Sequence, residues 1–286
     1  MSERKTVRVG GVPEHFNLPW LHAIENHRFA GLDVEVEWID FPGGTGAIMK
    51  ALEAGEIDLA TPLTEGAIMA IANGNSAKLV SMWVDSPLIW AIHAAGNSTA
   101  ETVTDLEGQR FAISRFGSGS ELMSRLLAND RGWELTDDSW VVVGGLDGAL
   151  AALPAGEAEI FLWNLSMTQP HVTNGTFKRV GELPTPWPSF TIAASSSFYR
   201  DSPDVASAIA LLARSEAEVV TEMSNLAGYV ESRYELGAGS ATEWASTVRW
   251  TPVDAEIDPE MVASVAEQMH RLGRIESVPP AETLIV

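Results

Sequence analysis

Residues 43–60 (GGTGAIMKALEAGEIDLA) and residues 144–161 (GGLDGALAALPAGEAEIF) repeat one pattern, and this repeat decides the fold that the sequence predicts. Both stretches open with Gly-Gly, continue with apolar residues at helical spacing, and then read Ala-Gly-Glu before an apolar segment. Gly144 stands 101 positions after Gly43, and the glycine of Ala-Gly-Glu recurs at the same offset. The register is therefore kept over the whole unit.

Each stretch predicts a turn at a strand end, a helix, and a second tight turn. A glycine pair after a strand lets the backbone turn sharply and leaves N–H groups exposed at the start of the helix. Gly55 and Gly156 follow the helical pattern, where a left-handed C-cap favours glycine. Two interpretations fit the repeat: chance recurrence of a common α/β unit, or two similarly built lobes. The match in register favours two lobes.

Strand-like segments alternate with helical patterns around the first stretch. Segments rich in β-branched residues begin at Thr6, Asp33, Ile57 and Lys78, with helical patterns between them. The alternation starts again after Leu88, and the C-terminal part of the chain is mostly helical in pattern. Such an order is typical of βαβ units and predicts an α/β protein with mainly parallel sheets.

The composition excludes several kinds of protein. The chain has 286 residues and a net charge of −21, so we expect neither nucleic acid nor an anionic membrane as partner. The absence of cysteine excludes disulfides and thiolate metal sites. Because the six histidines lack a compact ligand spacing and no apolar run reaches membrane-span length, we expect no metal, no cofactor and no membrane insertion. We expect a cytoplasmic location if Met1 is native, and a periplasmic one if a signal peptide was removed.

Residues 43–66 and the later stretch ISRFGSGSELMSRLLANDRGW, residues 113–133, resemble the type II periplasmic-binding-protein fold. The nearest branch holds the binding proteins for alkanesulfonates, taurine and thiamine precursors, together with the yeast thiamine-pyrimidine synthases. The resemblance covers nearly the whole chain and implies two lobes, joined by a two-strand hinge, with a ligand in the cleft between them. Lobe one would comprise residues 1–90 and 192–286, and lobe two residues 91–191.

The resemblance implies a solute-binding protein that closes on a small anionic organic ligand of the sulfonate, phosphate or carboxylate class. If exported, such a protein delivers its ligand to an ABC permease. The alternative is an enzyme like the thiamine-pyrimidine synthases, for which His15 with Glu14 or Glu65 would have to supply a general base. Those synthases carry a cofactor-binding lysine just after the third strand and a cysteine-rich cluster. This chain has neither, so we expect no catalytic residue.

Polar side chains follow the strands of lobe one, in turns that face the ligand in the family. Asn17 and Thr64 stand where they would cap the next helices, and Glu65 would present oxygens to a ligand amine or hydroxyl. A lone histidine such as His15 is more often structural than catalytic. The candidate ligand-binding residues of this lobe are His15, Asn17, Gly43, Gly44, Thr45, Thr64 and Glu65.

The loop SRFGSGSELM, residues 114–123, is the most informative part of lobe two. Its glycines and serines would present N–H groups and hydroxyls at the start of a helix, and Arg115 would add a charge-assisted contact, which together favour an anion. The same residues also fit an ordinary N-cap beside a solvated arginine. Further along, Trp163 and Asn164 offer a stacking face and an amide at a strand end. The candidate residues of this lobe are Arg115, Ser118, Gly119, Ser120, Trp163 and Asn164.

Overall fold

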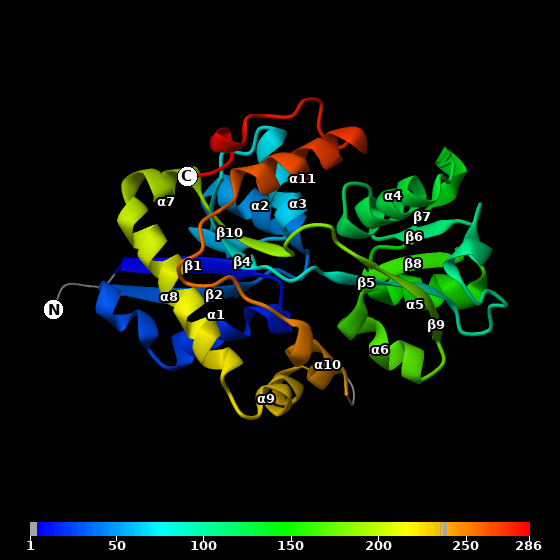
Figure 1. Ribbon diagram of the computed structural model, residues 1–286, viewed down its shortest axis with the longest axis horizontal. Coiled ribbons are helices and arrows are strands. Elements are labelled where there is room, and N and C mark those ends of the chain that lie inside the picture. The colour runs from blue at the N-terminus through cyan, green and yellow to red at the C-terminus, as the bar shows by residue number, and fades with distance from the viewer. Residues whose placement is uncertain (1–4, 235, 237–238) are drawn as a thin grey trace. The chain divides into compact units, whose positions relative to one another are not determined.

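Two five-stranded sheets organise the chain, and each belongs to a separate unit (Figure 1). The computed structural model describes residues 5–234, 236 and 239–286. Unit 1 comprises Met1–Pro87, Trp187–Tyr234 and Thr242–Val286, and unit 2 comprises Leu88–Pro186 and Glu235–Ala241. The chain thus enters unit 2 close to the first predicted crossover strand and leaves it close to the second.

The strands are β1 (Lys5–Gly11), β2 (Val34–Asp40), β3 (Leu59–Thr61), β4 (Lys78–Val84), β5 (Ile89–Ala95), β6 (Phe111–Ile113), β7 (Trp140–Val142), β8 (Ile160–Asn164), β9 (Phe177–Pro184) and β10 (Phe190–Ala194). The α-helices are α1 (Leu18–Glu25), α2 (Thr45–Ala54), α3 (Thr64–Ala72), α4 (Gly119–Arg131), α5 (Leu146–Ala155), α6 (Leu165–Thr173), α7 (Ser196–Asp201), α8 (Pro203–Thr221), α9 (Leu226–Arg233), α10 (Ser240–Thr247) and α11 (Pro259–Arg271). A short 3-10 helix, η1 (His15–Asn17), follows β1.

The two sheets have the same topology. Their strand orders are β2-β1-β3-β10-β4 in unit 1 and β7-β6-β8-β5-β9 in unit 2. In each sheet the first three strands are parallel, and the fourth runs antiparallel to both of its neighbours. These fourth strands, β5 and β10, follow the first two passages of the chain between the units. The predicted two-lobe α/β fold is confirmed, with one antiparallel strand in each mainly parallel sheet.

The repeated stretches form α2 and α5, and both helices end as predicted. Gly55 and Gly156 adopt left-handed φ angles of 67° and 69°. In both copies the residue after this glycine donates its N–H to a carbonyl five residues back, at 2.9 Å and 3.0 Å, which completes a Schellman motif. The helix starts differ in which glycine of the pair is left-handed. In the first copy it is the second glycine, Gly44, with φ 69°, and in the second copy it is the first glycine, Gly144, with φ 83°.

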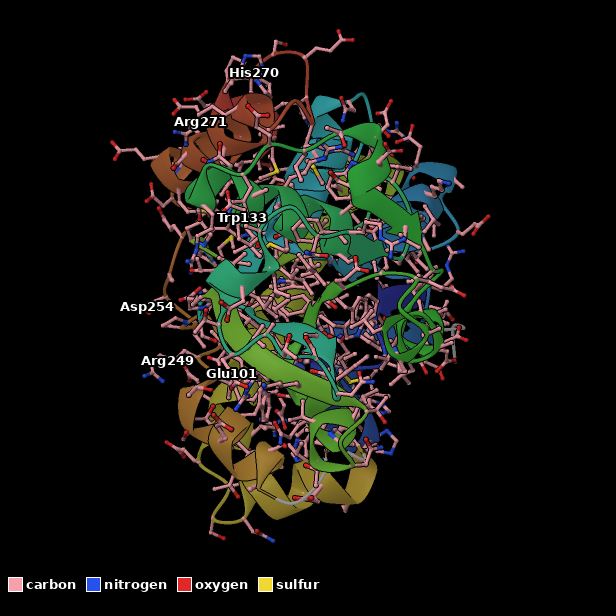
Figure 2. All side chains as sticks on the ribbon, turned by 90° about the vertical axis from the view of Figure 1, so that its right-hand side faces the viewer. Glu101, Trp133, Arg249, Asp254, His270 and Arg271 are labelled. Carbon is pink, nitrogen blue, oxygen red and sulfur yellow. The ribbon has the colours of Figure 1, made fainter. Side chains whose placement is uncertain are left out.

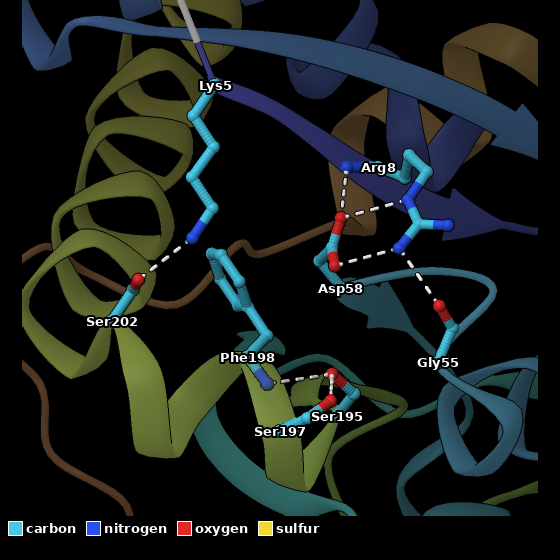
Figure 3. A network of polar contacts seen from close by, with 8 residues as sticks. All are labelled: Lys5, Arg8, Gly55, Asp58, Ser195, Ser197, Phe198 and Ser202. Carbon is cyan, nitrogen blue, oxygen red and sulfur yellow. Dashed lines mark hydrogen bonds and ion pairs between the residues drawn. The ribbon is translucent and has the colours of Figure 1, made fainter.

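An arginine–carboxylate clamp recurs with the repeat. In unit 1 the Arg8 guanidinium donates to both Asp58 oxygens, at 3.1 and 3.0 Å, and to the Gly55 carbonyl at 2.9 Å (Figure 3). In unit 2 Arg110 makes the same contacts with Glu159, at 3.1 and 2.6 Å, and with the carbonyl of the other C-cap glycine at 2.8 Å. The clamp in unit 1 fastens the turn after the repeated helix to β1, and the clamp in unit 2 fastens it to the residue just before β6.

The clamp in unit 1 is expected to contribute more to stability than the clamp in unit 2. Asp58→Asn should lower the free energy of unfolding by about 1–2 kcal/mol, because the carboxylate is only 16% exposed and holds a bidentate arginine. Glu159→Gln should cost roughly 0.5 kcal/mol at pH 7, since this carboxylate is 30% exposed. Urea denaturation of both variants measures the difference, and Glu157→Gln, an exposed neighbour, is the control.

The cost of Glu159→Gln should depend on pH in a defined direction. Hydrogen bonding from Arg110 holds the pKa of the Glu159 carboxyl below its ordinary value of 4.5. A lowered pKa in the folded state stabilises the protein at pH values above 4.5, and this contribution is lost as the pH falls through the lowered pKa. The wild type and Glu159→Gln should therefore converge in stability on acidification. A difference that stays constant down to pH 3 would contradict this.

The outer parts of both units follow ordinary packing rules. Trp20, Trp83 and Ile48 are fully buried in unit 1, and Phe161 and Phe177 are fully buried in unit 2. The ends of α11 suit its dipole, since Glu260 lies in the first turn and the exposed Arg271 lies in the last (Figure 2). Among the helices of the described residues, none combines the length and the apolar character that a bilayer crossing needs.

Candidate functional site

The candidate residues of unit 1 lie along one edge of its sheet. Gly11 at the end of β1 is level with Asp40 at the end of β2 and with Thr61 at the end of β3. Because the three strands are parallel, the turns that follow them start from the same edge. The structure brings together at this edge all the candidates predicted for the lobe: His15, Asn17, Gly43, Gly44, Thr45, Thr64 and Glu65.

His15 is fully buried among aromatic rings in η1. Its ring centroid lies 4.6 Å from that of Phe16, 4.5 Å from Trp244 and 6.0 Å from Tyr234. Burial lowers the pKa of His15 to about 3, so the imidazole is neutral at pH 7. Within the described residues neither ring nitrogen makes a hydrogen bond, and hence neither Glu14 nor Glu65 orients the imidazole as a general base.

Asn17 is buried and holds two segments together. Its amide nitrogen donates to the Val12 carbonyl at 2.9 Å, and its amide oxygen accepts from the Thr61 hydroxyl at 2.8 Å. Asn17 stands at the N-cap of α1, but its side chain makes no capping hydrogen bond, so the prediction of a side-chain cap is wrong. The amide instead ties the loop after β1 to the end of β3, because both partners are close in space and buried.

Thr45, the first residue of α2, joins two of the turns. Its hydroxyl oxygen accepts from the backbone N–H of Leu63 at 3.0 Å, just before α3. The two helix starts approach closely, since a Cβ at Gly66 would lie 2.5 Å from the Thr45 methyl carbon. Thr45 therefore has a structural role, and its hydroxyl hydrogen remains able to donate.

Thr64 and Glu65 carry further buried polar atoms of this edge that make no hydrogen bond within the described residues. Both side chains are buried, and no hydrogen bond within the described residues reaches Thr64 Oγ1 or Glu65 Oε1. The other carboxylate oxygen, Oε2, accepts from the Trp187 indole N–H at 2.8 Å. Burial raises the pKa of Glu65 to about 7, although the Trp187 contact opposes the shift. Leu63, not Thr64, occupies the N-cap of α3, so the predicted Thr64 cap is wrong.

A second carboxyl group borders this edge. Burial raises the pKa of Glu14, just before η1, to about 7. Burial also raises the pKa of Tyr234, near His15, to about 12. These groups and His15 are therefore largely uncharged or half-charged at neutral pH. Unit 1 thus presents hydrogen-bonding oxygens and aromatic rings at this edge, without a lysine or arginine in contact with His15, Thr64 or Glu65 among the described residues.

The candidate residues of unit 2 follow the parallel strands of its own sheet. Ile113 of β6 is level with Val142 of β7, and β8 pairs with β6 on the other side. The loop after β6 leads into α4, and the loop after β7 leads into α5. The carboxyl ends of these strands place together the turns that hold Arg115, Ser118, Gly119, Ser120, Gly144, Gly145, Trp163 and Asn164.

Three serine hydroxyls cluster at the start of α4. Ser120 Oγ lies 3.2 Å from Ser114 Oγ and 3.0 Å from Ser118 Oγ, and it accepts from the Ser114 N–H at 2.9 Å. Ser118 also caps α4 by accepting from the N–H of Glu121 at 3.3 Å. Three hydroxyls carry three hydrogens but share two contacts, so one hydrogen is left for an acceptor outside the cluster.

The same helix start already holds a carboxylate of the chain. Glu121 is buried and accepts from the Gly117 N–H at 2.9 Å and from Arg125 Nε at 2.5 Å. Glu121 was not among the predicted residues, although Ser118 and Glu121 have the Ser-x-x-Glu spacing of a capping box. The N–H of Gly117 is thus occupied, whereas Arg115 is exposed and no ion pair within the described chain engages it.

Trp163 and Asn164 end β8. The Trp163 ring stacks on Phe161 at a centroid distance of 5.3 Å and meets Trp90 edge-on at 6.4 Å. Asn164 caps α6, because its amide oxygen accepts from the N–H groups of Ser166 and Met167. Its amide nitrogen is buried, and within the described chain it donates to no acceptor. One half of this amide is therefore structural and the other half is able to donate.

Sequence reasoning missed two aromatic neighbours of the unit 1 edge, Tyr234 and Trp244, which contact His15. It also did not predict that Trp187 holds Glu65. Each of these residues lies more than 100 positions from its partner, so no local pattern reports the contact. Among the described residues no group of histidine, aspartate and glutamate side chains is arranged to hold a metal ion.

Unit 2 is similar in sequence to known binding proteins. Residues 90–183, within unit 2, match the model of the Ca3427-like PBP family. An aliphatic sulfonates-binding protein of Escherichia coli K12 is 32% identical over 103 residues, and the aligned part covers 36% of this chain and only 32% of that protein.

Solved structures match over the whole chain. The Candida albicans CA3427 gene product, described as having the generic periplasmic binding protein fold, superimposes with a TM-score of 0.90 at 24% identity, covering 98% of this chain and 96% of that one. The alkanesulfonate-binding protein SsuA of Xanthomonas axonopodis pv. citri, bound to MOPS, gives a TM-score of 0.81 at 15% identity, covering 100% and 99%. The predicted resemblance to type II periplasmic binding proteins is confirmed, and at these identities the likeness establishes the fold.

Proposed function

We propose that this chain, which has the type II periplasmic-binding-protein fold, is a solute-binding protein for a small anionic organic ligand. The ligand class is a sulfonate, phosphate or carboxylate. Residues that follow the parallel strands of unit 2 would contact its anionic group. The sulfonates named for the Escherichia coli and Xanthomonas proteins support this class.

The serine cluster at the start of α4 is the observation that carries the proposal. It leaves one hydroxyl hydrogen for an outside acceptor, and no acceptor within the described chain takes the backbone N–H groups of Gly119 and Ser120 at the helix start. Donors at the N-terminus of a 13-residue helix favour an anion, because the helix dipole adds to each hydrogen bond. Anionic oxygens accept from all of these groups.

Arg115 would give this helix start its local positive charge. The chain as a whole carries −21, so long-range attraction does not bring an anion to it. Arg115 stands two residues after the end of β6, and its side chain is exposed. A guanidinium at this place would neutralise an anionic head group and orient it by two parallel hydrogen bonds.

Isothermal titration with propane-1-sulfonate, propylphosphonate and butanoate tests the proposal. We expect at least one of them to bind, and Arg115→Ala to weaken that binding by roughly tenfold. Arg131→Ala is the matched control, because it removes the same charge from the exposed far end of α4. Ser120→Ala should also weaken binding, whereas Ser124→Ala removes a buried hydroxyl outside the cluster and should not. Equal affinities of wild type and Arg115→Ala would reject the anion site.

Export and delivery to an ABC permease belong to the same proposal. A protein that binds solute outside the cytoplasm would be recovered in the periplasmic fraction of its own cells. Immunodetection after osmotic-shock fractionation tests this location. Recovery in the cytoplasmic fraction alone would reject a transport role and leave the binding role standing.

A further inference from the structure

Two buried nitrogens of unit 2 lack an acceptor, and they belong to residues that stand opposite each other in neighbouring strands. Trp90 of β5 pairs with Asn164 of β8, so their Cβ atoms lie about 5 Å apart. Trp90 is 5% exposed and Asn164 is 7% exposed. Within the described residues neither Trp90 Nε1 nor Asn164 Nδ2 makes a hydrogen bond, and each has less than 1 Å² of exposed surface.

This pair differs from the remaining buried polar atom of unit 2 that has no partner. Among the described residues of the unit that atom is Nε2 of His93, whose Nδ1 lies 3.1 Å from the Phe161 carbonyl. Burial lowers the pKa of His93 to about 4, so the imidazole is neutral at pH 7, and its Nε2 is an acceptor when Nδ1 donates. Trp90 and Asn164 instead hold two unpaired donors, which destabilise a fold unless an acceptor reaches them.

The two donors extend the edge of unit 2 at which α4 starts. The strand order β6-β8-β5 places β8 between the other two strands, each about 5 Å away. Ala112 of β6 is level with Phe161 of β8, and Arg115 and Asn164 each stand three residues beyond this pair. Trp90 lies opposite Asn164 on the next strand. The start of α4, the amide and the indole therefore follow one another along this edge.

The missing partner must be a hydrogen-bond acceptor. The Asn164 amide cannot turn over to present its oxygen, because that oxygen accepts from the Ser166 and Met167 N–H groups as the cap of α6. The exposed half of the amide recognition is thus an NH₂ group, and an indole N–H also only donates. One sulfonate, phosphonate or carboxylate oxygen is able to accept from both nitrogens, whereas a cation finds no partner in them.

We propose that Trp90 and Asn164 bind the ligand as a pair, by donating to one oxygen of the anionic group that the start of α4 holds. This inference rests on the proposed function and adds Trp90, a residue of the antiparallel strand, to the residues that follow the parallel strands. Because both nitrogens are covered, the oxygen reaches them after a side chain turns. The half-buried Trp163, whose ring meets Trp90 edge-on at 6.4 Å, is placed to turn in this way.

Titration calorimetry of the full chain with propane-1-sulfonate, propylphosphonate and butanoate tests the role of Trp90. Trp90→Phe keeps an aromatic ring and removes the N–H, so it should weaken binding of the probe that the wild type binds by roughly fivefold. Its melting temperature without probe should be unchanged or higher, since the variant loses a buried donor that lacks an acceptor. Trp133→Phe is the control, because Trp133 packs against Phe111 at the opposite end of β6, and it should keep the wild-type affinity.

A second variant tests the amide. Asn164→Asp keeps the oxygen that caps α6 and replaces the donor by a carboxylate oxygen, so it should weaken binding at least tenfold through repulsion. Asn174→Asp makes the same change at the exposed C-terminal end of α6 and should keep the affinity. Adding Trp90→Phe to Asn164→Asp should weaken binding by less than twofold more, because both donors serve one oxygen. If Trp90→Phe does not fold, Asn164→Asp and its control still decide the question.

The outcomes separate this inference from the proposed function. Binding that Arg115→Ala weakens but that Trp90→Phe or Asn164→Asp leaves at the wild-type affinity would overturn the donor pair and keep the anion site. A lower melting temperature of Trp90→Phe without probe, together with unchanged affinity, would assign the indole N–H a structural role and would also overturn it. Binding of none of the three probes by the wild type would overturn both proposals.

Discussion

Gly148→Ala is expected to destabilise unit 2 by roughly 3 kcal/mol. A Cβ at this position in α5 would lie 1.7 Å from the carbonyl oxygen of Val143 and 2.7 Å from its carbonyl carbon. These are backbone atoms of the preceding turn, so no side-chain rotation relieves the clash. Either the turn after β7 or the helix start must shift. For a unit of this size the loss corresponds to a fall in melting temperature of about 13 °C, measured by calorimetry.

The comparison with the first repeat explains why glycine is needed here. The position that corresponds to Gly148 in α2 is Ala47. In the turn before α2 the left-handed residue is Gly44, the second glycine of the pair. In the turn before α5 the left-handed residue is Gly144, the first glycine of the pair, and this turn places the carbonyl of Val143 against the helix. Two copies of one pattern thus close in different ways.

Gly145→Ala is the matched control for this prediction. Its φ of 165° is extended backbone, and no atom lies within 4 Å of the place that an alanine methyl carbon would take at this position. We therefore expect its melting temperature to stay within about 2 °C of the wild type, as for a change without a packing effect. A Gly148→Ala variant that melts together with Gly145→Ala would show that the turn yields without cost.

Arg214→Met is expected to lower the stability of unit 1 by about 3 kcal/mol. Arg214, on α8, is 6% exposed and donates to Ser81 Oγ on β4 at 2.8 Å, to the Ala255 carbonyl at 2.8 Å, and to the Pro252 carbonyl. Methionine fills the space of the aliphatic stem but removes the donors to the buried Ser81 hydroxyl and to the partly buried Ala255 carbonyl, while the Pro252 carbonyl keeps the Ala255 N–H at 3.1 Å. Chemical denaturation followed by tryptophan fluorescence measures the loss.

Arg200→Met provides the control. The Arg200 side chain is 70% exposed, lies on α7 of the same unit, and pairs only with the neighbouring Asp201 within the described chain. Its replacement should change the free energy of unfolding by less than about 0.5 kcal/mol. If both arginine variants lost stability equally, the cause would be the lost charge rather than the lost hydrogen bonds to Ser81 and Ala255.

Local patterns predicted much of the fold. The Gly-Gly turns, the two repeated helices and the glycine caps at Gly55 and Gly156 all follow from residues within one stretch. The direction of β5 and β10 could not be predicted in this way. Hydrophobic periodicity reports burial and spacing, but it is the same for a parallel and an antiparallel strand.

The sequence predicted where the candidate residues lie better than it predicted which of their polar groups are already paired. The rule that parallel strands end at one edge brought His15, Thr45, Thr64 and Glu65 to the same place. Whether a polar group there is already paired depends on residues far along the chain. Trp187 pairs one Glu65 oxygen from 122 positions away, and no spacing rule includes such a contact.

The position of β10 in the sheet of unit 1 has a consequence for biosynthesis. β10 lies between β3 and β4 in the sheet of unit 1, yet it leaves the ribosome only after all five strands of unit 2. Until then β4 has no neighbour in its sheet, and the edge of β3 is unpaired. The first part of the chain to be made is therefore completed second. We expect a nascent chain released after Pro186 to contain a protease-resistant unit 2 joined to an unprotected N-terminal segment.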